Sequence, residues 1–263
     1  MTQRIQLHLA HLNLTEALRE VARWRDGTSI LEEDDLVLVA GRDSFPVGYF
    51  NAAIRTGARA HADDDIERAS AFFGAKGRGY TLWVRDGLDS DLEDAALARG
   101  FENQAEVPGM LVTTRPDDPS PLKGVDVRWA EDEQTVQDFV SIAAEAYVAV
   151  HLPAEVTAVA FGEPGRLLVP HVKIVVASVD GTPAAAALVL LSHGTAGVYW
   201  VGTREAHRGR GLGDLCTRLV TQAGFDAGAN GVCLQATPQG HDVYQRIGYR
   251  DVTTYRWYTP PEV

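Results

Sequence analysis

The segment Arg208-Gly209-Arg210-Gly211-Leu212-Gly213 combines the residue types that hold an anion. Glycines let the backbone turn tightly, so successive N–H groups can converge on one negatively charged group. A predicted helix follows directly, and a helix N-terminus carries a partial positive charge of about half a unit. Arg208 and Arg210 add two full positive charges. This composition is suited to a diphosphate.

Several kinds of loop could have this composition, the simplest being a glycine-rich turn between a strand and a helix. A dinucleotide-binding fingerprint requires Gly-x-Gly-x-x-Gly, but Asp214 stands where its third glycine belongs. A nucleoside-triphosphate loop requires Gly-Lys-Ser/Thr, which the segment lacks. The pattern Arg/Gln-x-x-Gly-x-Gly/Ala between a strand and a helix fits at every defining position.

The elements around the segment follow from apolar periodicity. Apolar runs separated by Asp-Gly and His-Gly turns predict three antiparallel strands over 172–179, 184–191 and 198–201. Leu215 to Ala223 have the spacing of a helix that ends near Gly228. Further predicted elements are a strand at 125–129, a helix capped by Asp132, a strand at 232–236, a helix at 241–247 and a strand at 249–258.

This loop and this order of elements resemble the GNAT superfamily of acyl-coenzyme A-dependent acyltransferases. A second motif of that family, a Tyr four residues before a Gly-Phe/Tyr pair, is matched by Tyr244 and Gly248-Tyr249 at the expected distance. The resemblance covers roughly residues 125–258. It implies an α/β (α+β) fold with a mixed, mostly antiparallel sheet flanked by helices.

The resemblance also implies a donor site and a reaction. The donor would be acetyl-CoA, its diphosphate on the loop amides and its pantetheine arm between splayed fourth and fifth strands, the fourth commonly bulged. Tyr244 matches the general acid that protonates the departing thiolate, although a buried space-filling Tyr is the simpler interpretation of any single Tyr. The residues implied to bind the donor are Val201, Thr203, Arg208, Gly209, Arg210, Gly211, Leu212 and Gly213.

No general base is evident, since the fourth strand lacks the Glu that many GNAT enzymes place there. The sequence offers Glu145, His171, His193 and Asp242 as candidates, and singles out none. Two positions depart from the family pattern near the Tyr244 helix, where Thr237 replaces a common Asn and Gly240 a common Ala.

Cys216 and Cys233 are expected to be core residues, because direct acyl transfer needs no covalent intermediate. The two cysteines are not spaced as metal ligands, and no metal site is expected.

Residues 56–100 repeat the helix, strand, helix order of residues 203–248. With the Pro-rich segment 114–124 as a linker, the repeat predicts two GNAT-like domains, a degenerate one at 1–113 without a donor site and a catalytic one at 125–263. The first copy has His61-Ala62-Asp63-Asp64-Asp65 at the loop position, where carboxylates would repel a diphosphate, and Ala96 at the Tyr244 position. Asp63 is expected to cap its helix, with Asp64 and Asp65 complementing the helix dipole.

Length and charge narrow the function further. A chain of 263 residues with 45% hydrophobic residues can fold without disulfides or metals. Its net charge of −12 disfavours binding to nucleic acid or to anionic membranes. We expect a cytoplasmic protein, because no signal peptide or membrane span is evident. We also expect a monomer or homodimer that acts on a small-molecule or peptide amine. The leading hypothesis is an acetyltransferase, and the alternative is a noncatalytic acyl-CoA-binding or regulatory protein.

Overall fold

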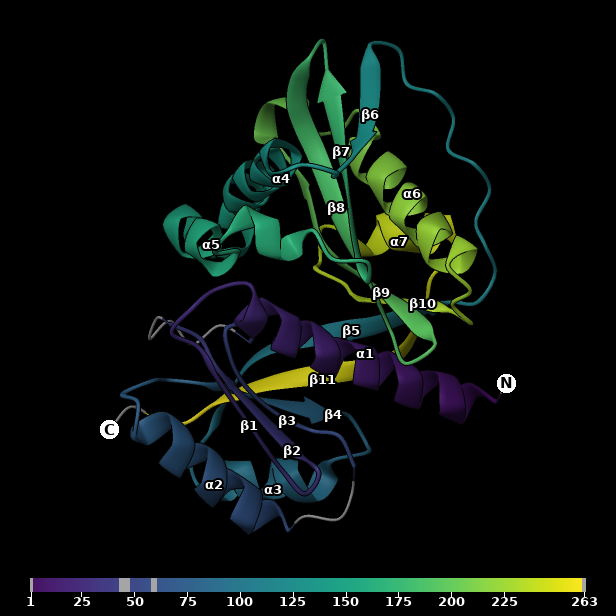
Figure 1. Cartoon of the computed structure of the whole chain (residues 1–263). Helices are drawn as coiled ribbons and strands as arrows, with labels where there is room; N and C mark the ends of the chain where they lie inside the picture. Colours follow the sequence, from purple (N-terminus) through teal and green to yellow (C-terminus); the bar gives the residue numbers. More distant parts are fainter. Residues whose placement is uncertain (1, 43–47, 58–60, 262–263) are drawn as a thin grey trace. The chain divides into compact units, whose positions relative to one another are not determined.

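The structure is a computed structural model that describes residues 2–42, 48–57 and 61–261. It divides the chain into two compact units, the first made of residues 1–14 and 110–251, the second of residues 15–109 and 252–263. Each unit is therefore built from more than one segment, whereas the sequence predicted contiguous domains. Figure 1 labels the elements of both units.

The first unit contains a sheet with helices on both faces. Its strands are β6 (Val125–Trp129), β7 (Val172–Val179), β8 (Thr182–Ser192), β9 (Thr195–Thr203) and β10 (Val232–Gln235), in that spatial order. Strands β6 to β9 are antiparallel neighbours, and β10 runs parallel to β9. Its helices are α4 (Glu133–Ala146), α5 (Ala154–Ala160), α6 (Leu212–Asp226) and α7 (His241–Ile247), with 3-10 turns at Tyr147–Val150, Pro164–Leu167 and Glu205–His207.

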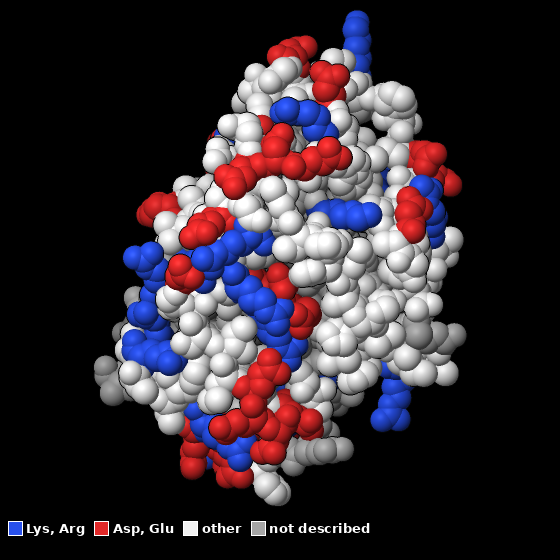
Figure 2. Space-filling model, viewed as in Figure 1, with Lys and Arg blue, Asp and Glu red and all other residues white. Residues whose placement is uncertain are grey.

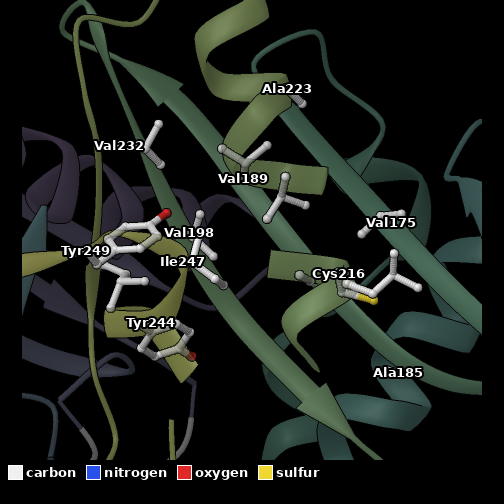
Figure 3. Close-up of a cluster of buried hydrophobic side chains, with 14 of the residues drawn as sticks. Val175, Ala185, Val189, Val198, Cys216, Ala223, Val232, Tyr244, Ile247 and Tyr249 are labelled. Atoms are coloured by element: carbon white, nitrogen blue, oxygen red, sulfur yellow. The ribbon is translucent and has the colours of Figure 1, made fainter. Parts of the chain in front are cut away.

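Helices α4 and α6 cover opposite faces of this sheet (Figure 1). Because both faces are covered, residues 184–190 of β8 are all buried, which explains why that strand reads as a continuous apolar run. The core on the α6 side contains Val189, Val198, Cys216 and Ala223 (Figure 3). Asp132 accepts a hydrogen bond from the Thr135 N–H (2.7 Å), which confirms the predicted cap of α4 and lowers the pKa of the Asp132 carboxyl.

The linker prediction at 114–124 is matched by a segment without helix or strand, but this segment is packed rather than free. The side chain of Gln222 on α6 donates to the Pro116 carbonyl (3.1 Å) and to Asp118 Oδ1 (2.9 Å). Arg115 is paired with Asp226 at the end of α6 (3.0 Å). The segment is therefore held along α6.

The second unit repeats part of this topology. Its sheet has the order β1 (Ser29–Glu33), β2 (Leu36–Ala40), β3 (Asn51–Arg55), β4 (Thr81–Arg85), β11 (Arg250–Thr259) and β5 (Glu102–Val112). Strands β1 to β3 are antiparallel neighbours and β4 is parallel to β3, which matches the arrangement of β7 to β10. Its helices are α2 (Ala62–Gly74) and α3 (Ser90–Ala98), together with the later part of α1 (Gln3–Arg23).

The final strand of each repeat belongs to the other unit. Strand β11 follows the copy at residues 203–248, which lies in the first unit. It nevertheless pairs with β4 of the second unit, where Tyr258 joins the core. Residues 110–112 follow the copy at residues 56–100, which lies in the second unit. They nevertheless belong to the first unit beside β10, where Met110 and Val112 join its core. We call this arrangement the strand exchange.

The beginning of α1 also belongs to the first unit. The fully buried Asn13 side chain donates to the Leu190 carbonyl (3.1 Å) and to Ser192 Oγ (2.9 Å). The Tyr199 hydroxyl donates to Asn13 Oδ1 (2.8 Å). These bonds satisfy the buried amide. Within the described part of the chain, no helix is long and apolar enough to cross a membrane.

Candidate functional site

A β-bulge in β9 reverses the direction of its backbone groups. Ala186 pairs with Gly202 and Leu188 with Tyr199, so Ala187 alone lies opposite both Trp200 and Val201. Ala196, before the bulge, donates its N–H to the Gly231 carbonyl on the β10 side (3.1 Å).

Arg204 lies after the bulge, and its position is an even number of residues away from that of Ala196. Its N–H nevertheless donates to the Ala184 carbonyl of β8, on the other side of β9 (2.8 Å). In an unbroken strand both N–H groups would face the same edge, because successive residues alternate. The bulge therefore places the N–H and C=O groups of Val201 and Thr203 at the edge that faces β10.

That edge is open. Strands β9 and β10 pair only through Ala196 with Val232 and Gly197 with Cys233, and no later residue of β9 has a partner in β10 among the described residues. The two strands therefore separate beyond Gly197. The implied splay and the implied bulge are both present, and Val201 and Thr203 lie where the two features meet.

The glycine-arginine segment joins the end of β9 to α6. Gly209 (φ 72°) and Gly211 (φ 78°) adopt the left-handed conformation that favours glycine, and Gly211 is the N-cap of α6. No side chain caps this helix, unlike α4, so its first N–H groups remain available to an external acceptor. Thr203 Oγ1 lies only 3.5 Å from the position that a Cβ would take at Gly213. The open edge and the helix N-terminus are thus adjacent.

Arg208 and Arg210 are exposed, and neither forms an ion pair with a described carboxylate. Arg208 Nε lies 3.4 Å from the Thr203 carbonyl, and Arg210 Nη1 lies 3.3 Å from His207 Nδ1. The neighbouring basic residues differ, because Arg204 is paired with Glu145 and Arg218 with Asp214 (2.7 Å). Two uncompensated positive charges therefore flank the start of α6. Figure 2 shows basic and acidic side chains mixed over much of this face, with a few basic side chains standing apart.

Tyr244 is placed by α7 in the core on the α6 side, with 8% of its surface exposed. Its phenol oxygen accepts or donates no hydrogen bond among the described residues, and burial raises the pKa of the phenol to about 12. Tyr249 is the contrasting case, since its hydroxyl is bonded to Thr221 Oγ1 (2.7 Å). Figure 3 shows the two hydroxyl groups pointing in different directions. Tyr244 is therefore a protonated, unengaged phenol.

Gly240 fits the ring of Tyr244 by lacking a side chain. A Cβ at Gly240 would lie 2.7 Å from Cε2 and 3.0 Å from the hydroxyl oxygen of Tyr244. The Thr237 hydroxyl accepts the Gly240 N–H (3.2 Å), which orders the turn before α7, although the helix N-cap is Gly240 itself. The departure from the family pattern at Gly240 is thus matched to the position of the Tyr244 ring.

The candidate bases lie at separate places in the first unit, and Glu145 is the one beside the end of β9. Glu145 accepts the Glu205 N–H (3.1 Å) and pairs with Arg204, so its carboxylate is engaged at the end of β9. His193 forms the turn between β8 and β9, and Asp242 is an exposed residue in the first turn of α7. Sequence reasoning missed His241, whose Nε2 lies 2.8 Å from Asp251 Oδ1 and which links α7 to β11.

Burial raises the pKa of the Cys216 and Cys233 thiols to about 12, so both remain protonated at neutral pH and are unreactive core residues. The described residues contain no group of His, Cys, Asp and Glu side chains able to hold a metal ion. A shallow surface groove of about 670 Å³ lies between α4 and α5, with Val140, Ala144, Val148 and Glu155 in its lining.

The equivalent position in the second unit is closed by its own side chains. Arg55, the last residue of β3, lies buried with Nε 2.5 Å from Asp65 Oδ2 and Nη1 2.9 Å from Asp91 Oδ1. Asp65 and Asp91 occupy the first turns of α2 and α3. Burial raises the pKa of Asp65, although Arg55 acts in the opposite direction.

The prediction for Asp63 is therefore wrong, because α2 has His61 as its N-cap and no side-chain cap. Asp64 and Asp65 do lie in the first turn of α2, as expected for partners of the helix dipole, and Asp65 is in addition the fully buried ion-pair partner of Arg55. A run of carboxylates before a helix is typical of an exposed helix start, and the sequence contains no sign that Arg55 reaches back into it.

The two copies agree at their other end. The Phe101 N–H donates to the Ala96 carbonyl (3.0 Å) past Gly100, as the Tyr249 N–H donates to the Tyr244 carbonyl (3.0 Å) past Gly248. Ala96 and Tyr244 are thus equivalent. At the first end, Arg55 and Thr203 each end their strand, so the sequence alignment of Thr56 with Thr203 is displaced by one residue. With Arg55 in that place the two segments have equal length.

Comparison with known proteins agrees with this geometry. Residues 120–246 match the family model of the acetyltransferase (GNAT) domain. A GCN5-related N-acetyltransferase from Kribbella flavida superposes with a TM-score of 0.75 at 20% identity, covering 100% of this chain and 96% of that one. A tandem GNAT protein from the clavulanic acid biosynthesis pathway gives 0.63 at 14% identity, covering 96% of each chain.

A GCN5-related N-acetyltransferase from Sphaerobacter thermophilus gives a TM-score of 0.60 at 16% identity, covering 95% of this chain and 86% of that one. Comparison with curated proteins finds no match. The predicted fold class is confirmed by these structures, and the recognition of the family by the model match. Residues 120–246 therefore match the acetyltransferase (GNAT) domain family, the family indicated by the glycine-arginine segment and by Tyr244.

Proposed function

We propose that this protein transfers an acetyl (acyl) group from acetyl-CoA to an amine acceptor by direct attack. The observation that carries the proposal is the continuity of three features. The uncapped N-terminus of α6, the reversed backbone groups of β9 and the unengaged Tyr244 phenol belong to one unit. Each feature suits a different part of an acyl-CoA molecule.

The diphosphate would bind at the start of α6. Backbone N–H groups over residues 209–213 face a position where the helix dipole favours negative charge, and Arg208 and Arg210 supply charge-assisted hydrogen bonds. Both guanidinium groups can turn toward a ligand, since neither is held by a described carboxylate. Leu212 is buried and anchors the first turn to the core.

The pantetheine arm would extend the sheet at the open edge of β9. Its amides can pair with the backbone groups of Val201 and Thr203, as an added strand would. Pairing at this edge also holds the thioester in one orientation, which converts attack by the amine into an effectively unimolecular step.

Tyr244 would act on the leaving group. The amine nitrogen forms a bond to the thioester carbon, the C–S bond breaks, and the sulfur takes the phenolic proton of Tyr244. Tyr244 then regains a proton from solvent, and the amine releases its own proton to water. A phenol with a pKa of about 12 holds its proton until negative charge develops on the sulfur.

We also propose that only the copy at residues 203–248, in the first unit, binds the donor. Asp65 and Asp91 fill the helix starts of the first copy with carboxylates, and Arg55 already neutralises them. Ala96 provides no phenol at the position of Tyr244.

The test is coenzyme A release from acetyl-CoA in the presence of a panel of small amines, amino acids, polyamines and peptides. Calorimetry with coenzyme A is run in parallel. Binding with turnover on at least one amine supports the acetyltransferase. Binding without turnover across the panel favours the alternative, a noncatalytic acyl-CoA-binding protein. Absence of binding contradicts both.

A further inference from the structure

Trp200 has a backbone conformation that a bulky residue rarely adopts. Its φ is +54°, in the left-handed region. The other described non-glycine residues with positive φ are Asp34, Asp180 and His193, which lie in turns between strands, and His151, which ends a 3-10 turn. Trp200 differs because it lies within a strand. It is also the residue at which the bulge of β9 begins.

The indole ring of Trp200 is held by two other aromatic rings. The ring centroids of Tyr147 and Phe161 lie 5.0 Å and 4.9 Å from that of Trp200, and 6% of Trp200 is exposed. Tyr147 begins the 3-10 turn after α4, and Phe161 directly follows α5. Phe139 of α4 contacts Phe161 (5.1 Å) and is fully buried. The contacts of Phe161 are edge-to-face and that of Tyr147 with Trp200 is tilted, and such contacts restrict ring position.

The side-chain cluster and the backbone strain therefore meet at one residue. A strained conformation persists only where the surroundings over-determine it. If β9 relaxed to a regular strand, the backbone groups of Val201 and Thr203 would turn toward β8 and away from the open edge. The rings of Tyr147 and Phe161 pack against Trp200 where they can oppose this relaxation.

We infer that Trp200 is a positioning residue, whose indole, clamped by Tyr147 and Phe161, keeps Val201 and Thr203 turned toward the pantetheine arm. The inference rests on the proposed function. It adds that the segment between α4 and α5, on the face of the sheet opposite α6, controls how the donor is held.

Binding measurements can test the clamp without turnover. The nucleotide fragment of coenzyme A, which lacks the pantetheine arm, would bind only the glycine-arginine segment at the start of α6. Coenzyme A would also bind the open edge of β9. In Phe161→Leu we expect the affinity for coenzyme A to fall about tenfold, because two or more backbone hydrogen bonds are lost, with the affinity for the fragment unchanged. The matched control is Phe139→Leu, which removes a buried ring whose centroid lies 5.1 Å from that of Phe161.

Substitutions of Trp200 itself separate the ring from the backbone. Glycine adopts positive φ without strain, so Trp200→Gly keeps the bulge accessible while removing the clamp. We expect kcat to fall about 10²-fold in this variant, since small misplacements of a reacting group have effects of that size. Trp200→Phe retains an aromatic ring and should recover kcat to within about threefold of the original protein.

Three results would overturn the inference. These are equal loss of coenzyme A and fragment affinity in Phe161→Leu, equal effects of Phe161→Leu and Phe139→Leu at matched stability, and full kcat in a folded Trp200→Gly. Failure of the original protein to bind coenzyme A would instead overturn the proposed function, and the inference with it. If Trp200→Gly does not fold, the two Phe variants decide.

Discussion

Helix α6, which follows β9, begins directly after a segment with two arginines and two glycines, whereas α2, which follows β3, carries three aspartates in its first turn. Both helices begin without a side-chain cap, so both N-termini favour a negative partner. The second unit supplies that partner from its own chain, as Asp65, and neutralises it with Arg55. The first unit leaves the position free and places positive charge beside it.

On the proposed function, a helix N-terminus becomes a ligand site only where the sequence supplies no internal anion to it. The strands before the two helices also differ. Strand β3 pairs with β2 in regular register to its last residue, whereas β9 is bulged and leaves backbone groups unpaired at one edge.

The largest expected effect comes from removing the internal cation of the second unit. Arg55→Met would leave Asp65 buried beside an apolar chain, and we expect the free energy of unfolding to fall by about 3–5 kcal/mol. Urea unfolding measures this loss. Affinity for coenzyme A should not change in the folded variant.

Two further variants control this result. Arg68→Met removes an exposed pair with Asp34 and should leave the urea unfolding curve almost unchanged. Adding Asp65→Asn to Arg55→Met should recover part of the loss, because the buried charge is gone. A loss below about 1 kcal/mol for Arg55→Met would mean that the pair does not hold the second unit together.

Tyr244→Phe tests the phenol that Ala96 cannot replace in the first copy. We expect kcat to fall about 10²-fold or more, with the dissociation constant of coenzyme A changed by less than about twofold. Stability should be unaffected, because the phenol has no hydrogen-bond partner among the described residues. Steady-state thiol release and calorimetry give the two quantities.

The control for Tyr244 is Tyr249→Phe, which breaks the bond to Thr221 and should lower stability by about 1 kcal/mol without changing kcat. The pH dependence adds a second check. Since burial raises the pKa of Tyr244 to about 12, the phenol stays protonated at any lower pH, and its ionisation should cause no loss of activity up to about pH 10. An alkaline decline near the ordinary Tyr pKa that disappears in Tyr244→Phe would contradict this.

Arg210→Gln tests whether the positive charge beside α6 is reserved for a ligand. We expect affinity for coenzyme A to fall about tenfold and its dependence on salt to weaken, because a charge-assisted hydrogen bond is lost. Stability should not change, as Arg210 has no ion-pair partner among the described residues. Arg246→Gln, an exposed change on α7, is the matched control for net charge. Equal effects of the two variants would contradict a local site.

Gly240→Ala tests the fit of the Tyr244 ring. The added methyl group would lie 2.7 Å from the ring, so the ring must move, and we expect kcat to fall about tenfold and stability by about 1–3 kcal/mol. Gly74→Ala in α2 is the control, since nothing lies within 4 Å of its Cβ position and stability should rise by about 0.5–1 kcal/mol. Unchanged kcat in Gly240→Ala would show that the ring position does not matter.

Local patterns gave most of the secondary structure of the second copy. The strands, α6, α7 and the Asp132 cap follow from apolar spacing and turn residues within a few positions of one another. The short helix α5 was not predicted, because a helix of this length has too few turns to show a periodicity. The loop and Tyr244 could be found because their residue types sit at fixed spacing.

Long-range features could not be found in this way. The apolar alternation of β11 is the same whether it pairs with its own copy or with β4, so the strand exchange leaves no local trace. The burial of Asp65 depends on Arg55, and the strain at Trp200 depends on Tyr147 and Phe161, all through tertiary contacts. The donor-site residues remain a prediction that the proposed experiments test.

The strand exchange limits how either copy could be lost from the gene during evolution. A gene cut within the segment 114–124 would give two products, each lacking the strand that completes its own core. Deleting the first copy would remove Met110 and Val112 from the unit that carries Tyr244, and deleting the second would remove Tyr258 from the other. We therefore expect loss of either copy to destabilise the unit that keeps the other, so selection for the copy at residues 203–248 would also preserve the copy at residues 56–100.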